Sequence, residues 1–177
     1  MPSLVFDPRR ALLLRRIIIG ILALLGSAVA TTAVACPSFS NPGAPLSFNG
    51  AGLWSAQRFS VTAGGSEQLS ACPGIPGSGF VATSPDFSLT YANVSNHDLE
   101  FRVEGSCDTV LLVNDASGQW QFNDDSNGAD PRIRLSSASS GRYDIWVGTF
   151  GSSLCSSTLV LETFGGGGGG TLGTPPP

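Results

Sequence analysis

The sequence contains no lysine, a single histidine and no CxxC pair. A structural zinc site is therefore not expected, because such sites need four closely spaced Cys or His ligands. Serines are abundant, but none lies in the G-x-S-x-G motif of the α/β-hydrolase nucleophile. His97 sits in the polar stretch NVSNHDLEF, and we interpret it as a turn residue. We expect a protein that is not an enzyme; a secreted hydrolase using His97 and Asp98 is the alternative.

Basic residues are concentrated at the N-terminus. Four arginines lie between residues 9 and 16, and an uncharged run from Ile17 to Ala35 follows them. This order is typical of a secretory signal peptide over residues 1–35. An uncleaved membrane anchor is an alternative, as is a lipid on Cys36, because AVAC resembles a bacterial lipobox. We expect an exported protein, periplasmic or extracellular, that meets a membrane only through the signal or that lipid.

The four cysteines form an even set. Their layout suggests disulfides between Cys36 and Cys72 and between Cys107 and Cys155, although sequence alone does not fix connectivity. A lipid on Cys36 would leave one thiol unpaired in an oxidising compartment. Without residues 1–35 the chain carries five basic and twelve acidic residues, a formal charge of 5 − 12 = −7. A nucleic-acid partner is therefore not expected, and the five remaining arginines are scattered along the sequence.

Residues 36–45 are rich in Pro, Ser, Asn and Gly, which indicates an extended entry segment. Between this segment and residue 165, apolar residues recur at every second position in several stretches, which predicts strands. Helical spacing is absent there, and turn dipeptides such as Ser117-Gly118 separate the segments. We predict an all-β fold over residues 36–165, an antiparallel β-sandwich or jelly roll of seven to nine short strands tied by disulfides. A Gly/Pro-rich flexible tail is expected over residues 166–177. The predicted strands are 53–61, 87–91, 99–103, 110–112, 120–122, 133–135, 143–150 and 158–164.

The stretch QFNDDSNGADP, residues 121–131, has two interpretations. It contains several of the oxygen ligands that calcium prefers, but it lacks the closing glutamate of an EF-hand loop, where Arg134 stands. The simpler interpretation is a hairpin loop, because Asp and Asn stabilise tight turns. No cofactor is required by either interpretation. If calcium binds, the candidate ligands are Asp115, Asp124, Asp125 and Asp130.

Tryptophans are the other candidates for ligand binding, because an aromatic face can stack on a sugar ring. Trp146 alternates with apolar residues and is expected in the core. Trp120 lies beside a turn and the polar stretch, so Trp120 and Asn123 are candidate ligand contacts, with core packing of Trp120 as the alternative.

Residues 107–151 resemble the bacterial pre-peptidase C-terminal domain family. The matching elements are Asp108, the strand 111–113, Asp115 to Gly118, Asp124 to Ser126, and Gly141 to Val147. The resemblance implies a jelly-roll sandwich attached to exported proteins, with relatives that bind calcium, polysaccharide or collagen. We therefore expect a binding or accessory module whose partner is a polysaccharide or an extracellular or envelope protein. A structural component of the envelope or cell surface is the further alternative.

Overall fold

The computed structural model describes residues 35–126 and 128–165. The predicted tail and all but the last residue of the predicted signal peptide lie outside the described residues, as does Asn127. No helix in the described part of the chain is long and apolar enough to cross a membrane.

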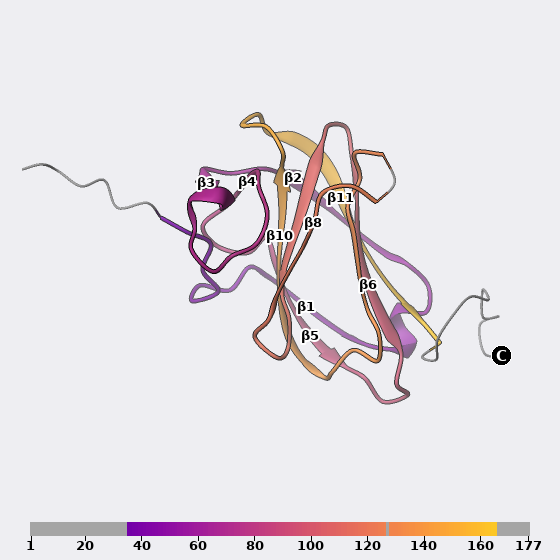
Figure 1. The fold of residues 1–177 in the computed structure, drawn as a ribbon. Helices are drawn as coiled ribbons and strands as arrows, with labels where there is room; N and C mark the ends of the chain where they lie inside the picture. Colours follow the sequence, from indigo (N-terminus) through magenta and orange to yellow (C-terminus); the bar gives the residue numbers. More distant parts are fainter. Residues whose placement is uncertain (1–34, 127, 166–177) are drawn as a thin grey trace, which may run out of the picture. The chain divides into compact units, whose positions relative to one another are not determined.

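The described residues form eleven strands in two sheets (Figure 1). The seven-stranded sheet has the order β1-β5-β10-β4-β3, with β7 paired to β10 and β8 paired to β7, and the four-stranded sheet has the order β2-β11-β6-β9. The larger sheet contains β1 (Ala44–Asn49), β3 (Glu67–Gln68), β4 (Phe80–Val81), β5 (Phe87–Ala92), β7 (Thr109–Asn114), β8 (Trp120–Asn123) and β10 (Gly141–Thr149). The smaller sheet contains β2 (Gln57–Ala63), β6 (Asp98–Gly105), β9 (Arg132–Leu135) and β11 (Cys155–Phe164).

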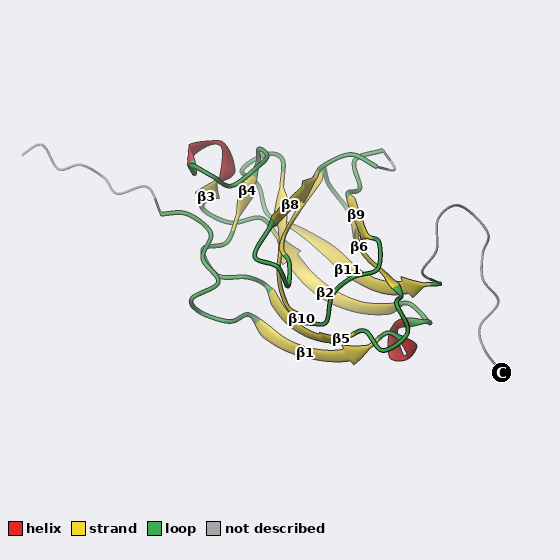
Figure 2. Ribbon diagram, turned by 60° about the horizontal axis from the view of Figure 1, so that its bottom comes forward, coloured by secondary structure: helices red, strands yellow, loops and turns green. Residues whose placement is uncertain are grey.

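The predicted all-β sandwich is confirmed, but the described residues form eleven strands, where seven to nine were predicted, because two-residue strands such as β3 and β4 show no sequence period. The strand β1 pairs with β5 in parallel, whereas the other described pairings are antiparallel. Leu53, predicted as the first residue of a strand, is instead the last residue of the 3-10 helix η1 (Ala51–Leu53). A second 3-10 helix, η2 (Leu69–Ala71), adjoins β3. The two short helices lie at opposite sides of the domain (Figure 2).

The main core lies between the two sheets. Alternate residues of each strand point inward, as the period-two pattern predicts. The larger sheet contributes Leu89, Tyr143 and Ile145, and the smaller sheet contributes Phe101, Leu159 and Leu161, all 0–1% exposed.

A second apolar cluster covers the outer face of the larger sheet. Val110, Leu112 and Trp146 point to this face, and Leu69 and Val81 from the β3–η2–β4 segment cover them. Trp146 is 0% exposed, so its prediction as a core residue is confirmed. This second cluster makes the larger sheet apolar on both faces along part of β7 and β10.

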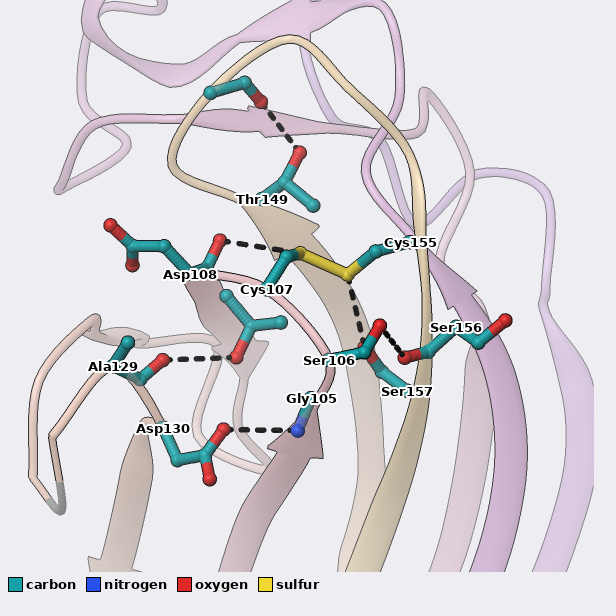
Figure 3. Close-up of a disulfide and its surroundings, with 12 residues drawn as sticks. Gly105, Ser106, Cys107, Asp108, Ala129, Asp130, Thr149, Cys155, Ser156 and Ser157 are labelled. Carbon is teal, nitrogen blue, oxygen red and sulfur yellow. Dashed lines mark hydrogen bonds between the residues drawn. A yellow bond between two sulfur atoms is a disulfide. The ribbon is translucent and has the colours of Figure 1, made fainter.

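The two disulfides join the cysteine pairs that the sequence layout suggested. Cys36 is bonded to Cys72 and anchors the N-terminal segment to the end of η2. Cys107 is bonded to Cys155 and joins the loop before β7 to the start of β11 (Figure 3). Each bridge restricts a segment that no strand pairing holds at that point.

The arginines are not scattered in space. Four of the five that follow residue 35 lie on the outer face of the smaller sheet, where the register aligns Arg58, Arg102 and Arg132 across the strands. Acidic residues interleave with them: Arg102 Nη1 lies 2.6 Å from Glu162 Oε2, and Arg58 donates two hydrogen bonds to Glu104. The face is therefore mixed in charge rather than basic.

Candidate functional site

Asp115 forms the turn between β7 and β8. Its Oδ1 accepts hydrogen bonds from the backbone N–H groups of Ser117 and Gln119 at 2.9 and 3.0 Å and from the Ser117 hydroxyl at 2.6 Å. Its Oδ2 accepts one from Gln121 Nε2 at 3.1 Å. Burial opposes ionisation of Asp115, but these hydrogen bonds outweigh it and hold its pKa below the ordinary value. Asp115 therefore acts as the residue that closes this hairpin.

The polar stretch after β8 forms a longer loop that leads to β9. Asn123 Oδ1 accepts hydrogen bonds from Ser126 Oγ at 2.7 Å and Arg132 N at 2.8 Å, so it closes the base of the loop. Asp130 Oδ1 accepts one from Gly105 N at 2.9 Å, beside the Cys107–Cys155 disulfide (Figure 3). The predicted ligand contact Asn123 therefore has a role within the loop itself.

The structure does not bring the four candidate calcium ligands together. Asp115 precedes β8 and Asp124 follows it, so the four residues of β8 separate them, roughly 13 Å at about 3.3 Å per residue. Asp124, Asp125 and Asp130 share the loop at the other end of β8. Within the described residues, no three His, Cys, Asp or Glu side chains are grouped so as to hold a metal ion. Calcium stays a prediction for that loop alone.

Trp120 lies at the start of β8 on the outer face of the larger sheet. It is half-buried, and its ring centroid lies 5.3 Å from that of Trp146 beneath it. On its other side, its centroid lies 6.2 Å from that of Phe39, which comes from the N-terminal segment and is 48% exposed. Three aromatic rings therefore lead from the second apolar cluster to the solvent.

Polar groups border this aromatic pair. Arg142 Nη2 donates a hydrogen bond of 3.1 Å to the carbonyl oxygen of Phe39 and one of 2.8 Å to Asp144 Oδ1. The Arg142 side chain is 47% exposed, whereas that of Asp144 is 5% exposed. Ser88 Oγ donates to the same Asp144 oxygen and accepts from Gly43 N at 3.0 Å. We call the area formed by Phe39, Trp120 and Arg142 the Phe39–Trp120 surface.

His97 does not belong to a catalytic arrangement among the described residues. Its ring packs edge-on against Trp54 at a centroid distance of 5.6 Å, and its buried Nδ1 has no hydrogen-bond partner in the described part of the chain. The Asp98 carboxylate instead bonds to Arg134 and to the backbone N–H of Ser137. The geometry therefore gives the hydrolase alternative no His-Asp pair.

Sequence reasoning identified Trp120 but missed Phe39 and Arg142. The stretch 36–45 was interpreted as an extended entry segment, and no local pattern links it to β8 or β10. The Cys36–Cys72 disulfide is the one signal that could have placed Phe39 on the folded domain, since it anchors the chain three residues before that ring.

No protein-family model matches the chain, and no curated protein matches it. The solved structures that are similar to it include the following two. One is the pre-peptidase C-terminal domain of a collagenase from Bacillus anthracis, with 13% sequence identity, a TM-score of 0.39, and coverage of 70% of this chain and 99% of that chain. The other is Aeromonas hydrophila PliG, a periplasmic inhibitor of g-type lysozyme, with 12% identity, a TM-score of 0.37, and coverage of 69% and 99%. At these TM-scores neither similarity decides family or function, so the family stays a prediction.

Proposed function

We propose that the protein is an exported, non-catalytic β-sandwich module that binds a polysaccharide through the Phe39–Trp120 surface. The observation that carries the proposal is the partly exposed Trp120, whose ring lies between the buried Trp146 and the exposed Phe39. Aromatic side chains with restricted motion provide large contact areas at little entropic cost, and their faces suit the C–H groups of a sugar ring.

The polar border supports the same function. In the described part of the chain, Arg142 Nη1 has no hydrogen-bond partner, while Nε and Nη2 are engaged by Asp144 and Phe39. A guanidinium that is fixed on one side and free on the other can donate to ligand hydroxyls without reorganising. Export is supported by the signal-like N-terminal sequence and the two disulfides, which persist in oxidising compartments.

The test is retention of the purified domain by a panel of insoluble polysaccharides, comparing wild type with Trp120→Ala. We expect a polysaccharide that retains the wild type to bind the variant about tenfold or more weakly, as for a buried aromatic contact residue. Trp54→Ala is the matched control, because Trp54 is also half-buried but packs on His97, away from this surface. Equal retention of Trp120→Ala and wild type would refute the proposed surface. Retention of an envelope protein instead of any polysaccharide would favour the protein-ligand alternative.

A further inference from the structure

A cleft of about 260 Å³ opens between the β7–β8 turn and the loop from β9 to β10. We call it the end cleft. Its volume lies just below the range of about 300–1,000 Å³ that is usual for drug-sized ligands, so it suits a single sugar or side-chain-sized group. Its polar lining includes Asp115, Ser117, Arg134, Ser137, Ser139 and Tyr143.

The serine-rich wall of the end cleft, residues 136–139, is held by hydrogen bonds from its backbone. The N–H of Ser137 donates to Asp98 Oδ1 at 2.9 Å, and the carbonyl oxygen of Ser139 accepts from Tyr143 Oη at 2.7 Å. Ser137 has a φ of 49°, a left-handed conformation that is costly for serine and persists only where its surroundings impose it. The side chains of residues 136, 137 and 139 are exposed, and their hydroxyls bond to none of the described residues. This wall therefore has a restrained backbone and presents hydroxyl groups that bond to none of the described residues.

The opposite wall carries an uncompensated negative charge. Asp115 accepts hydrogen bonds only from neutral groups within the described residues, namely those of Ser117, Gln119 and Gln121. The charge of Asp115 also acts on Tyr143. Burial raises the pKa of the Tyr143 phenol, and the negative charge of Asp115 raises it further, to about 12. The positive charge of Arg134 is offset by Asp98, whose Oδ2 lies 3.2 Å from Arg134 Nη2. The end cleft is thus electronegative at Asp115.

We propose that the end cleft binds a small hydroxylated ligand through a primary ammonium group held by Asp115. An ammonium has three donors and no acceptor, which complements a carboxylate that lacks a cationic partner. The serine hydroxyls opposite can donate to or accept from the hydroxyl groups of the same ligand. This site does not depend on the Phe39–Trp120 surface. Successive side chains of a strand point to opposite faces, so Gln121, whose side chain bonds to Asp115, points away from the face on which Trp120 lies.

The probe is glucosamine, which carries both an ammonium and hydroxyl groups, compared with glucose and N-acetylglucosamine. Binding is measured by backbone amide chemical shifts in NMR titrations of the labelled domain, at mildly acidic pH and with a chelator present. We expect glucosamine to shift the amides of Ser117 and Ser137 and to bind at least tenfold more tightly than the two uncharged sugars. Equal affinities for the three sugars, or no shift at these amides, would overturn the proposal.

Asp115→Asn tests the charge while keeping an acceptor for the N–H groups of Ser117 and Gln119. We expect it to weaken glucosamine binding about tenfold or more, the usual effect of losing a charge-assisted hydrogen bond. Asp108→Asn is the matched control, because Asp108 is exposed and precedes β7, whereas Asp115 follows β7. This variant should bind glucosamine as the wild type does. An undiminished affinity of Asp115→Asn would refute the role of Asp115. If that variant fails to fold, the comparison of the three sugars on the wild type still decides.

Discussion

Asp86 lies just before β5 with its carboxylate largely removed from water. Its Oδ2 accepts a hydrogen bond from the backbone N–H of Val147 at 2.7 Å, and its own N–H donates to the Ile145 carbonyl oxygen at 2.9 Å. Burial raises the pKa of Asp86 from 3.8 to about 6, because the hydrogen bond from Val147 only partly compensates for the loss of water. The folded state therefore favours the protonated carboxyl.

The raised pKa fixes the sign of a stability effect. Below about pH 4 the Asp86 carboxyl is protonated in both the folded and the unfolded protein, and its contribution to the free energy of unfolding is then fully present. As the pH rises through 6, this contribution is lost, because the carboxyl ionises more readily in the unfolded protein than in the folded one. A shift of about two units corresponds to about 3 kcal/mol. Asp86→Asn keeps an acceptor for Val147 and carries no charge. We therefore expect the free energy of unfolding of the variant minus that of the wild type to be larger at pH 8 than at pH 4, by up to about 3 kcal/mol.

The measurement is urea denaturation of both proteins across pH 4 to 8. The wild type should lose stability relative to Asp86→Asn mainly between about pH 4 and 6. A difference between the two proteins that stays constant over this range would refute the reasoning, because it would show that Asp86 ionises in the folded state as easily as in the unfolded state.

Three further predictions concern stability. Replacing both Cys107 and Cys155 by serine should lower the free energy of unfolding by about 4 kcal/mol, because the bridge closes a loop with a sequence separation of 48. Urea denaturation of the oxidised wild type and of the variant checks this, and an unchanged denaturation midpoint would contradict it. Gly65→Ala should cost about 3 kcal/mol, since the new Cβ would lie 2.1 Å from a backbone oxygen at the end of β4, and a wild-type melting temperature would contradict that contact. Chelators should leave the wild-type melting temperature unchanged, because hydrogen bonds close the loop after β8. If a chelator instead lowers the melting temperature of the wild type but not that of the double variant Asp124→Asn, Asp125→Asn, calcium orders this loop.

The sequence was sufficient for long strands with closely spaced apolar residues. β6, β7 and β10 have six or more residues each and contain such residues, so they are recognisable as strands. Trp146 was assigned to the core because its strand is apolar at successive positions, and β10 is buried on both faces there. The two-residue strands β3 and β4 are too short to show any period. β1 was missed because its edge position leaves most of its residues exposed, and its neighbouring Pro, Ser, Asn and Gly residues indicated an irregular segment.

The candidate sites were harder to predict, because they depend on contacts between distant segments. Asp115 and Asp124 are close in sequence, but β8 carries them to opposite ends of a hairpin. Phe39 and Arg142 join Trp120 only through the folding of the N-terminal segment over β10. The arginines of β2, β6 and β9 share a face because of strand register, which a linear reading of the sequence does not provide.

The most direct test of the proposed binding surface uses the indole N–H signals of the three tryptophans. The labelled domain is titrated with a soluble fragment of the polysaccharide that retains it. We expect the Trp120 signal to move in a saturable way, whereas the Trp54 signal, from a ring packed on His97, should stay in place. Binding of the fragment with an unmoved Trp120 signal, or no binding to any polysaccharide, would contradict the central claim.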